Sequence, residues 1–322
     1  MRLRRVAPGS PGWTRRRAGR GFVLLDETGA RITDPEVRER VRALAIPPAW
    51  RDVWICPWPH GHLQATGLDD AGRRQYLYHP AWSERRARRK HEHVLGVARR
   101  LPAARGRVTR DLALPGMPRD RALALAFRLL DVAYFRVGGE AYARGNGSYG
   151  LATVRREHVA VRGDRATFVY AAKSGQVREV EVIDDAVARA VRSLLRREDD
   201  HPDLLAYRDG ARWRDVTSAD IAAYLKDRLG PEATPKDFRT WHGTVLAATA
   251  LARVPVPPSP RARAAAVTAV VREVAEQLGN TPAVCRASYV DPRVVDLWER
   301  GALGEPGRTR SAAERAVLEA LG

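Results

Sequence analysis

The spacing of apolar residues changes near residue 90 of the chain. Between residues 21 and 78 the apolar residues come in short runs separated by glycine, proline and aspartate, a pattern typical of strands. The pair Asp34-Pro35 is a capping sequence and predicts one helix inside this region. Beyond residue 82 the apolar residues recur about every 3.6 positions, which predicts helices. We therefore expect an α+β protein, with a small antiparallel-sheet domain over residues 1–90 and a larger, mainly helical domain over residues 91–322.

The larger domain contains one predicted group of three strands, within residues 152–182. A turn over residues 173–176 places Lys173 at a hairpin tip, where few packed neighbours are expected. A helical stripe of apolar residues also leads along the chain to Arg136. The domain is thus expected to be mainly helical with a small three-stranded sheet.

A proline-rich linker over residues 254–260 precedes the last part of the pattern. The following helix is predicted to end at Gly279, because glycine tolerates the left-handed backbone that commonly closes a helix. Thr281-Pro282 then begins the helix that bears Tyr289.

Charge narrows the class of partner. The chain has 56 Lys and Arg against 38 Asp and Glu, a net charge of +18. Such a surface gains phosphate contacts by counterion release, which favours a nucleic acid over a membrane. No apolar stretch resembles a signal peptide or a membrane span. The arginine-rich first seventeen residues are interpreted as a flexible basic arm.

Cysteine and histidine positions give no metal or disulfide signal. Cys56 and Cys285 are the two cysteines and lie far apart, which fits a reducing cytoplasm. His91-Glu92-His93 is the one tempting metal pattern, but its i, i+2 spacing directs the two rings differently on a helix. We expect solvated histidines there and no metal site.

Five residues could together carry out chemistry on a phosphodiester: Arg136, Lys173, Arg239, Asn280 and Tyr289. A phenol that attacks phosphorus needs fixed cations for the developing charge and a proton donor for the departing oxygen. Two guanidiniums can hold both nonbridging oxygens, and a lysine among arginines has a lowered pKa suited to proton donation. Taken singly, each residue has an ordinary structural interpretation. The hypothesis rests on the set and its order.

That order, Arg, Lys, Lys-x-x-Arg, Asn, Tyr, resembles the type IB DNA topoisomerases, specifically the short bacterial and poxvirus-like branch. The resemblance covers most of the chain, and it is the combination of segments in this order that is specific. These segments are Ile46-Pro47-Pro48-Ala49-Trp50, Gly61-His62-Leu63-Gln64-Ala65, Gly72 to His79, Phe135-Arg136-Val137-Gly138, Tyr149 to Thr153, Lys173-Ser174-Gly175, Lys236-Asp237-Phe238-Arg239-Thr240, Leu278 to Pro282, and Ser288-Tyr289.

The resemblance implies that Tyr289 forms a 3′-phosphotyrosyl link while Lys173 protonates the leaving 5′-oxygen. The nicked strand then rotates and is religated, without ATP, metal or small-molecule cofactor. Arg136, Arg239 and Asn280 would stabilise the transition state. Many members of the wider superfamily have histidine where this chain has Asn280, and an amide serves only charge stabilisation.

The resemblance also implies partners and binding residues. Double-stranded DNA would be bound by a monomer in the cytoplasm, associated with the nucleoid. The first domain would act as a DNA clamp, and its residues Gln75, Tyr76 and Tyr78 match DNA contacts. Tyr142 and Lys236 match phosphate contacts. From the residues alone, the two first-domain tyrosines are equally interpreted as a cross-strand aromatic pair in a sheet.

Two alternatives remain. A tyrosine site-specific recombinase uses an almost identical site, but recombinases typically carry His-x-x-Arg around the second arginine. Here that arginine belongs to Lys236-Asp237-Phe238-Arg239, and none of the eight histidines begins a His-x-x-Arg. A noncatalytic basic nucleoid protein would bind DNA and leave its topology unchanged.

Overall fold

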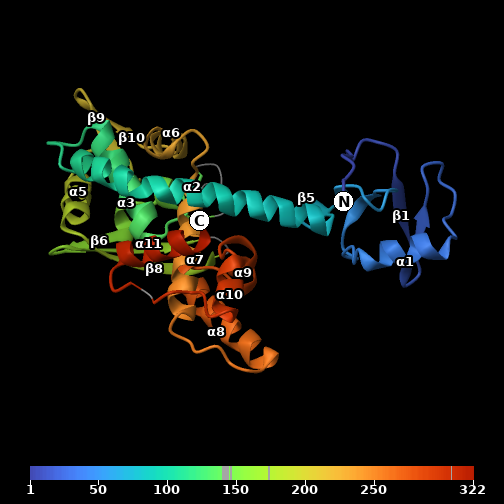
Figure 1. The fold of residues 1–322 in the computed structure, drawn as a ribbon. Helices are drawn as coiled ribbons and strands as arrows, with labels where there is room; N and C mark the ends of the chain where they lie inside the picture. The colour runs from blue at the N-terminus through green and yellow to red at the C-terminus, as the bar shows by residue number, and fades with distance from the viewer. Residues whose placement is uncertain (140–144, 146, 173–174, 306) are drawn as a thin grey trace. The chain divides into compact units, whose positions relative to one another are not determined.

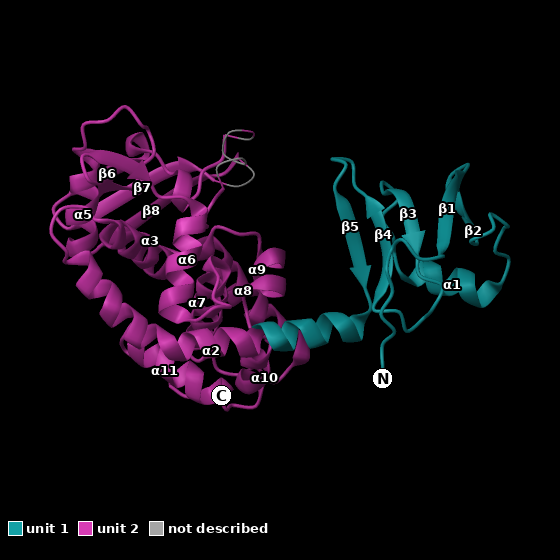
Figure 2. Ribbon diagram, turned by 90° about the horizontal axis from the view of Figure 1, so that it is seen from above, with its two compact units in different colours: residues 1–90 teal, residues 91–322 magenta. Residues whose placement is uncertain are grey.

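The computed structural model describes residues 1–322 except 140–144, 146, 173–174 and 306. The chain divides into two compact units, Met1–Lys90 and His91–Gly322, drawn in separate colours in Figure 2. The fold is α+β, with an antiparallel sheet in the first unit and mostly helices in the second, as predicted.

Unit 1 is built on a five-stranded antiparallel sheet in the order β2-β1-β3-β4-β5. One helix packs against it, because Val41 shares a small apolar core with Val53 and Ile55. The Asp34 side chain accepts from the backbone N–H groups of residues 36 and 37, so it caps this helix as predicted. The elements are β1 Trp13–Ala18, β2 Gly21–Leu25, α1 Pro35–Ala43, β3 Arg51–Ile55, β4 Leu63–Leu68 and β5 Arg74–Tyr78.

The prediction of a flexible basic arm over the first seventeen residues is wrong, because β1 lies inside the sheet between β2 and β3. Consecutive arginines in β1 hide the alternation of inward and outward side chains that normally identifies a strand. Arg15 points to the protein side, where its guanidinium donates to the carbonyls of Ile46 (3.0 Å) and Trp50 (3.0 Å) and lies 4.1 Å from the Phe22 ring centroid. Composition alone cannot distinguish an arginine that tethers a loop from one that is solvated.

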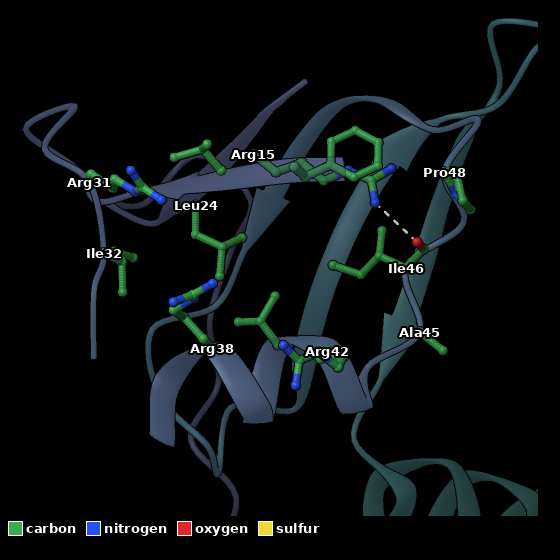
Figure 3. A pocket seen from close by; sticks show the side chains of 12 residues that line it. Arg15, Leu24, Arg31, Ile32, Arg38, Arg42, Ala45, Ile46 and Pro48 are labelled. Atoms are coloured by element: carbon green, nitrogen blue, oxygen red, sulfur yellow. Dashed lines mark hydrogen bonds between the residues drawn. The ribbon is translucent and has the colours of Figure 1, made fainter. Parts of the chain in front are cut away.

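A cavity of about 330 Å³ lies between α1 and the β1–β2 edge of this sheet. Figure 3 shows apolar side chains, including Leu24 and Ile46, on its walls and the arginines Arg31, Arg38 and Arg42 among its lining residues. Its lining residues all belong to unit 1.

Unit 2 packs its helices around one large apolar core. Figure 1 shows the elements along the chain. The helices are α2 Pro80–Leu112, which begins in unit 1, α3 Arg119–Ala133, α5 Asp185–Leu195, α6 Ser218–Leu229, α7 Pro235–Leu251, α8 Pro260–Leu278, α9 Pro282–Ser288, α10 Arg293–Glu299 and α11 Arg310–Leu321. Two short 3₁₀ helices, Leu151–Thr153 and Arg156–His158, replace the first part of the strand predicted from residue 152.

The predicted three-stranded sheet is present, in the order β6-β7-β8, with strands Val159–Arg162, Arg165–Ala171 and Val177–Ile183. Its inward residues pair across the strands: Phe168 with Val180, and Ala166 with Val182. A second hairpin, β9 Ala206–Asp209 with β10 Arg212–Asp215, was not predicted, because its arginines and aspartates mask the alternation.

A buried ion cluster joins four helices of unit 2. Asp131 on α3 is 2% exposed and accepts from Arg105 on α2 (2.8 and 2.9 Å) and from Arg310 on α11 (2.6 Å). His242 on α7 places Nε2 3.0 Å from the same carboxylate. Glu314 on α11 takes the remaining bonds of Arg105 at 2.5 and 2.8 Å. We call these five side chains the Asp131 cluster.

The expectation of solvated histidines at residues 91 and 93 is wrong. His91 is buried and places Nδ1 3.7 Å from Asp291, whereas His93 lies 3.1 Å from Asp237. The two rings do point to different partners, as the i, i+2 spacing predicts. Both partners are aspartates from segments distant in the sequence, which the local basic sequence does not reveal.

Candidate active site

Four of the five candidate residues converge in unit 2 around the C-terminus of α8. They are Arg136, Arg239, Asn280 and Tyr289. The fifth, Lys173, lies outside the described residues, as does the predicted phosphate contact Tyr142.

Arg136 is positioned by the way α3 ends. Tyr134 takes a left-handed backbone, with φ 55°, and so turns the chain out of the helix. Two residues later the Arg136 guanidinium donates from Nη2 to the Gly279 carbonyl (2.6 Å) and to Asn280 Oδ1 (2.5 Å). The helix thus leads to Arg136 as predicted, but the arginine itself follows a sharp turn.

Arg239 lies near the start of α7 and is 3% exposed. Its Nη1 donates to the Tyr134 carbonyl, and its Nη2 donates to the Leu278 carbonyl at 2.6 Å. Burial, with repulsion from Arg136, lowers the pKa of Arg239 to about 10. Its Nε is buried and has no hydrogen-bond partner among the described residues. Within the described part of the chain, no carboxylate is paired with this guanidinium.

Asn280 follows the left-handed Gly279, with φ 61°, that ends α8 as predicted. Its Oδ1 accepts from Arg136, so its amide nitrogen points away from that arginine. This Nδ2 is buried and also has no partner in the described part of the chain. The site thus presents two N–H donors, on Arg239 and Asn280, without acceptors.

Tyr289 caps the C-terminus of α9 and is half-buried. The Arg239 Cζ lies 5.1 Å from its ring centroid. Its backbone is fixed on both sides: the N–H donates to Cys285 (2.9 Å), and the carbonyl accepts from Thr244 Oγ1 (3.2 Å). Gly243 on α7 leaves the space for this, since a Cβ there would lie 2.9 Å from the Tyr289 carbonyl oxygen.

One residue of this site was missed. Arg178 on β8 donates from Nη2 to the Gln277 carbonyl at 2.7 Å, beside the carbonyls that hold the other two arginines. A signal for it exists in the sequence: Arg178 occupies the inward register of Val180 and Val182, where a strand normally places an apolar residue.

The remaining predicted DNA contacts lie on exposed elements. Lys236 is exposed in the first turn of α7, three residues before Arg239. Gln75, Tyr76 and Tyr78 lie on β5 of unit 1, with both tyrosines exposed. The tyrosine rings stack at 6.1 Å along one strand, so the alternative of a cross-strand pair is wrong. Residues i and i+2 of a strand share one face.

Comparison with known proteins decides the family. A family model described as "Bacterial DNA topoisomerase IB, N-terminal domain" matches residues 21–69. A second, described as "Eukaryotic DNA topoisomerase I, catalytic core", matches residues 80–296 and thus more than half of the chain. The chain belongs to the type IB DNA topoisomerases.

A curated relative agrees with this assignment. The protein named "DNA topoisomerase 1B" of Acanthamoeba polyphaga mimivirus is 28% identical over 297 residues, which cover 89% of this chain and 88% of the relative. This topoisomerase is therefore an enzyme that acts on double-stranded DNA.

Two features are absent from the described residues of the topoisomerase. No group of three or more His, Cys, Asp or Glu side chains among them is arranged to hold a metal ion. Over the same residues, no helix has the length and apolar content needed to cross a bilayer.

Proposed function

We propose that this topoisomerase relaxes supercoiled DNA by transiently cleaving one strand, with Tyr289 as the nucleophile. The observation that supports this most directly is the site itself. A half-buried tyrosine lies beside the buried Arg239, and Arg136 and Asn280 are hydrogen-bonded to each other next to them. Among the described residues no carboxylate neutralises these guanidiniums. A phosphodiester supplies the missing negative charge.

In the proposed step the Tyr289 oxygen forms a bond to phosphorus and the bond from phosphorus to O5′ breaks. The tyrosine loses its proton, and the departing O5′ gains one. Arg136 and Arg239 bind the nonbridging oxygens, and the free amide N–H of Asn280 adds a further donor. The reverse step restores the phosphodiester after rotation of the free end. Because the phosphotyrosine retains the bond energy, religation requires no ATP. The arginines supply the positive charge that a metal ion would otherwise provide.

Lys173 is proposed as the proton donor to O5′. This role rests on its place in the family's motif order, since the residue lies outside the described part of the structure. Tyr142 and Lys236 are proposed to bind backbone phosphates on the same basis. Comparing cleavage by Lys173→Ala on an ordinary duplex and on one with sulfur in place of the bridging O5′ tests the donor. Thiolate leaves without protonation, so only the ordinary duplex should be cleaved slowly.

Unit 1 is proposed to bind the duplex as a clamp domain through β5. Tyr76 and Tyr78 are 46% and 37% exposed, and their stacked rings present a flat surface. Gln75 is oriented by its bond to Asp69 at 2.8 Å. Rigid aromatic side chains lose little entropy on binding, which suits them to an interface.

We expect the double substitution Tyr76→Ala, Tyr78→Ala to weaken duplex binding by about tenfold or more. Fluorescence anisotropy with a labelled duplex measures this. Phe22→Ala is the matched control, because Phe22 is 39% exposed on β2, at the opposite edge of the same sheet. Equal affinities of the double variant and the control would contradict the assignment of β5.

Gly243→Ala is expected to slow cleavage by up to about 10²-fold, because it displaces the Tyr289 backbone. The added Cβ would lie 2.9 Å from the Tyr289 carbonyl oxygen and 3.1 Å from Tyr289 Cβ. Single-turnover formation of the covalent complex measures the rate. Gly96→Ala on α2 is the control, since a Cβ there meets nothing within 4 Å. A Gly243→Ala enzyme as fast as the control would show that this close approach does not position the tyrosine.

The whole proposal is tested by relaxation of a supercoiled plasmid in EDTA without ATP. We expect complete relaxation, and trapped protein on the 3′-phosphate end of the broken strand. A recombinase would instead require its own recombination site, and a noncatalytic nucleoid protein would bind the plasmid without relaxing it.

The enzyme is further proposed to act as a monomer on the cytoplasmic nucleoid. A mass above 35.7 kDa in sedimentation would contradict the monomer.

A further inference from the structure

Three arginines, from three different elements, bind three successive carbonyls at the C-terminus of α8. Arg178 of β8 donates to Gln277 at 2.7 Å. Arg239 of α7 donates to Leu278 at 2.6 Å. Arg136, after α3, donates to Gly279 at 2.6 Å. The last carbonyls of a helix lack partners within it and lie at the negative end of its dipole, so they suit cations.

Each of the three guanidiniums holds its α8 carbonyl through Nη2, and Arg239 also binds the Tyr134 carbonyl through Nη1. That arrangement fixes the cations close together, although like charges repel. Burial and repulsion from Arg136 lower the pKa of Arg178, which a contact with Tyr170 only partly opposes. No carboxylate among the described residues forms an ion pair with Arg178. The third arginine, like the other two, is held ready for an anion from outside the chain.

The strand register argues that this charge is not incidental. Arg178 lies opposite Tyr170 on the inward face of the sheet, in line with Val180 and Val182. An apolar residue at this position would avoid the cost of burying a charge. The guanidinium also lies close to Gly279: a Cβ at residue 279 would overlap the end of the Arg178 side chain, which would then have to move.

We propose that Arg178 binds the DNA phosphate adjacent to the one that reacts, on the cleaved strand. This rests on the proposed function of Tyr289. The reacting phosphate has two nonbridging oxygens, and the two arginines of the proposed step, Arg136 and Arg239, suffice for them. Arg239 faces the Tyr289 ring, and Arg136 bonds Asn280, whereas Arg178 enters from the Tyr170 side of the sheet. Its charge therefore extends the cationic surface along the backbone.

The test measures whether the effect of replacing Arg178 depends on the charge of one particular DNA phosphate. Single-turnover cleavage by the full chain is measured on a duplex of ordinary phosphates. It is then repeated with an uncharged methylphosphonate at the reacting position, or at the neighbour on its 5′ or 3′ side. On the ordinary duplex we expect Arg178→Gln to slow cleavage by about 10–10²-fold, comparable to loss of one charge-stabilising donor or less. With a methylphosphonate at one neighbouring position, the loss should shrink to less than about threefold, because the partner charge is already absent.

Two results would overturn the assignment. If Arg178→Gln slows cleavage equally on every duplex, Arg178 only supports the end of α8. If the effect shrinks only when the methylphosphonate is at the reacting position, Arg178 binds the reacting phosphate instead. Arg178→Met, similar in length and apolar, replaces the glutamine variant if the latter does not fold. Arg162→Gln, an exposed arginine on β6 of the same sheet, is the control and should cleave normally.

Failure of this inference is distinguishable from failure of the proposed function. If the unaltered enzyme forms no covalent complex on ordinary DNA, the proposed function itself fails. If it forms the complex but the Arg178 variants show no coupling to a neighbouring phosphate, only the inference fails.

Discussion

Tyr289→Phe binds duplex DNA with unchanged affinity, forms no covalent complex and leaves a supercoiled plasmid unrelaxed. This is the expected result, because the substitution removes only the attacking oxygen and keeps the ring that lies 5.1 Å from the Arg239 guanidinium. The backbone bonds of residue 289 to Cys285 and Thr244 do not involve the side chain and remain. Folding and the arginine positions are therefore preserved.

The measurement combines plasmid relaxation in EDTA with denaturing electrophoresis of protein bound to a labelled duplex. Tyr207→Phe is the control, since Tyr207 lies on β9 and is half-buried like Tyr289. That variant should relax the plasmid normally. A covalent complex formed by Tyr289→Phe would show that another residue is the nucleophile, and peptide mapping of the adduct would identify it.

The motif order named four residues that the structure brings together, whereas the local patterns did not predict the backbone turns that position them. The apolar stripe ahead of Arg136 correctly predicted a helix there, and the glycine at 279 correctly placed the end of α8, because that cap is specified by neighbouring residues. The left-handed turn at Tyr134, whose carbonyl binds Arg239, has no such local signal. It is imposed by packing between helices distant in the sequence.

Polar residues that become buried account for the errors. Arg15 and His91 were expected in solvent, but Arg15 is half-buried against carbonyls and His91 is buried beside a carboxylate, all contributed by distant segments. Near the C-terminus, α11 packs on the core of unit 2 through Ala313, Val317 and Leu321. Long-range partners determine such burial, so a single sequence predicts it poorly.

The Asp131 cluster gives the second large expected effect. Asp131→Ala should destabilise unit 2 by about 3–5 kcal/mol, the usual loss when one partner of a buried ion pair is removed. Arg105 and Arg310 would lose the carboxylate that holds them against α3. For a domain of this size the loss corresponds to a fall in Tm of roughly 6–20 °C.

Thermal unfolding followed by circular dichroism measures this, with Asp185→Ala as the control. Asp185 forms a surface pair with Arg189, in which both side chains are more than half exposed, so its loss should cost less than about 1 kcal/mol. Asp131→Asn keeps an acceptor oxygen and should fall between the two. Equal Tm values for Asp131→Ala and the control would show that the cluster contributes no net stability.

The effect should also depend on pH in a defined direction. Burial alone would raise the pKa of Asp131, but hydrogen bonds from His242 and Arg105 outweigh it and hold that pKa below its ordinary value. A carboxyl whose pKa is lowered by folding stabilises the protein above its unfolded pKa, and this contribution is lost as the pH falls. The Tm difference between the unaltered enzyme and Asp131→Ala should therefore be largest near neutral pH and narrow below about pH 4. The cluster joins α3 to α7. Tyr134, which follows α3, holds Arg239 of α7 through its carbonyl, and Arg136 comes two residues later. Loss of the cluster should therefore also slow cleavage at temperatures where the variant is still folded.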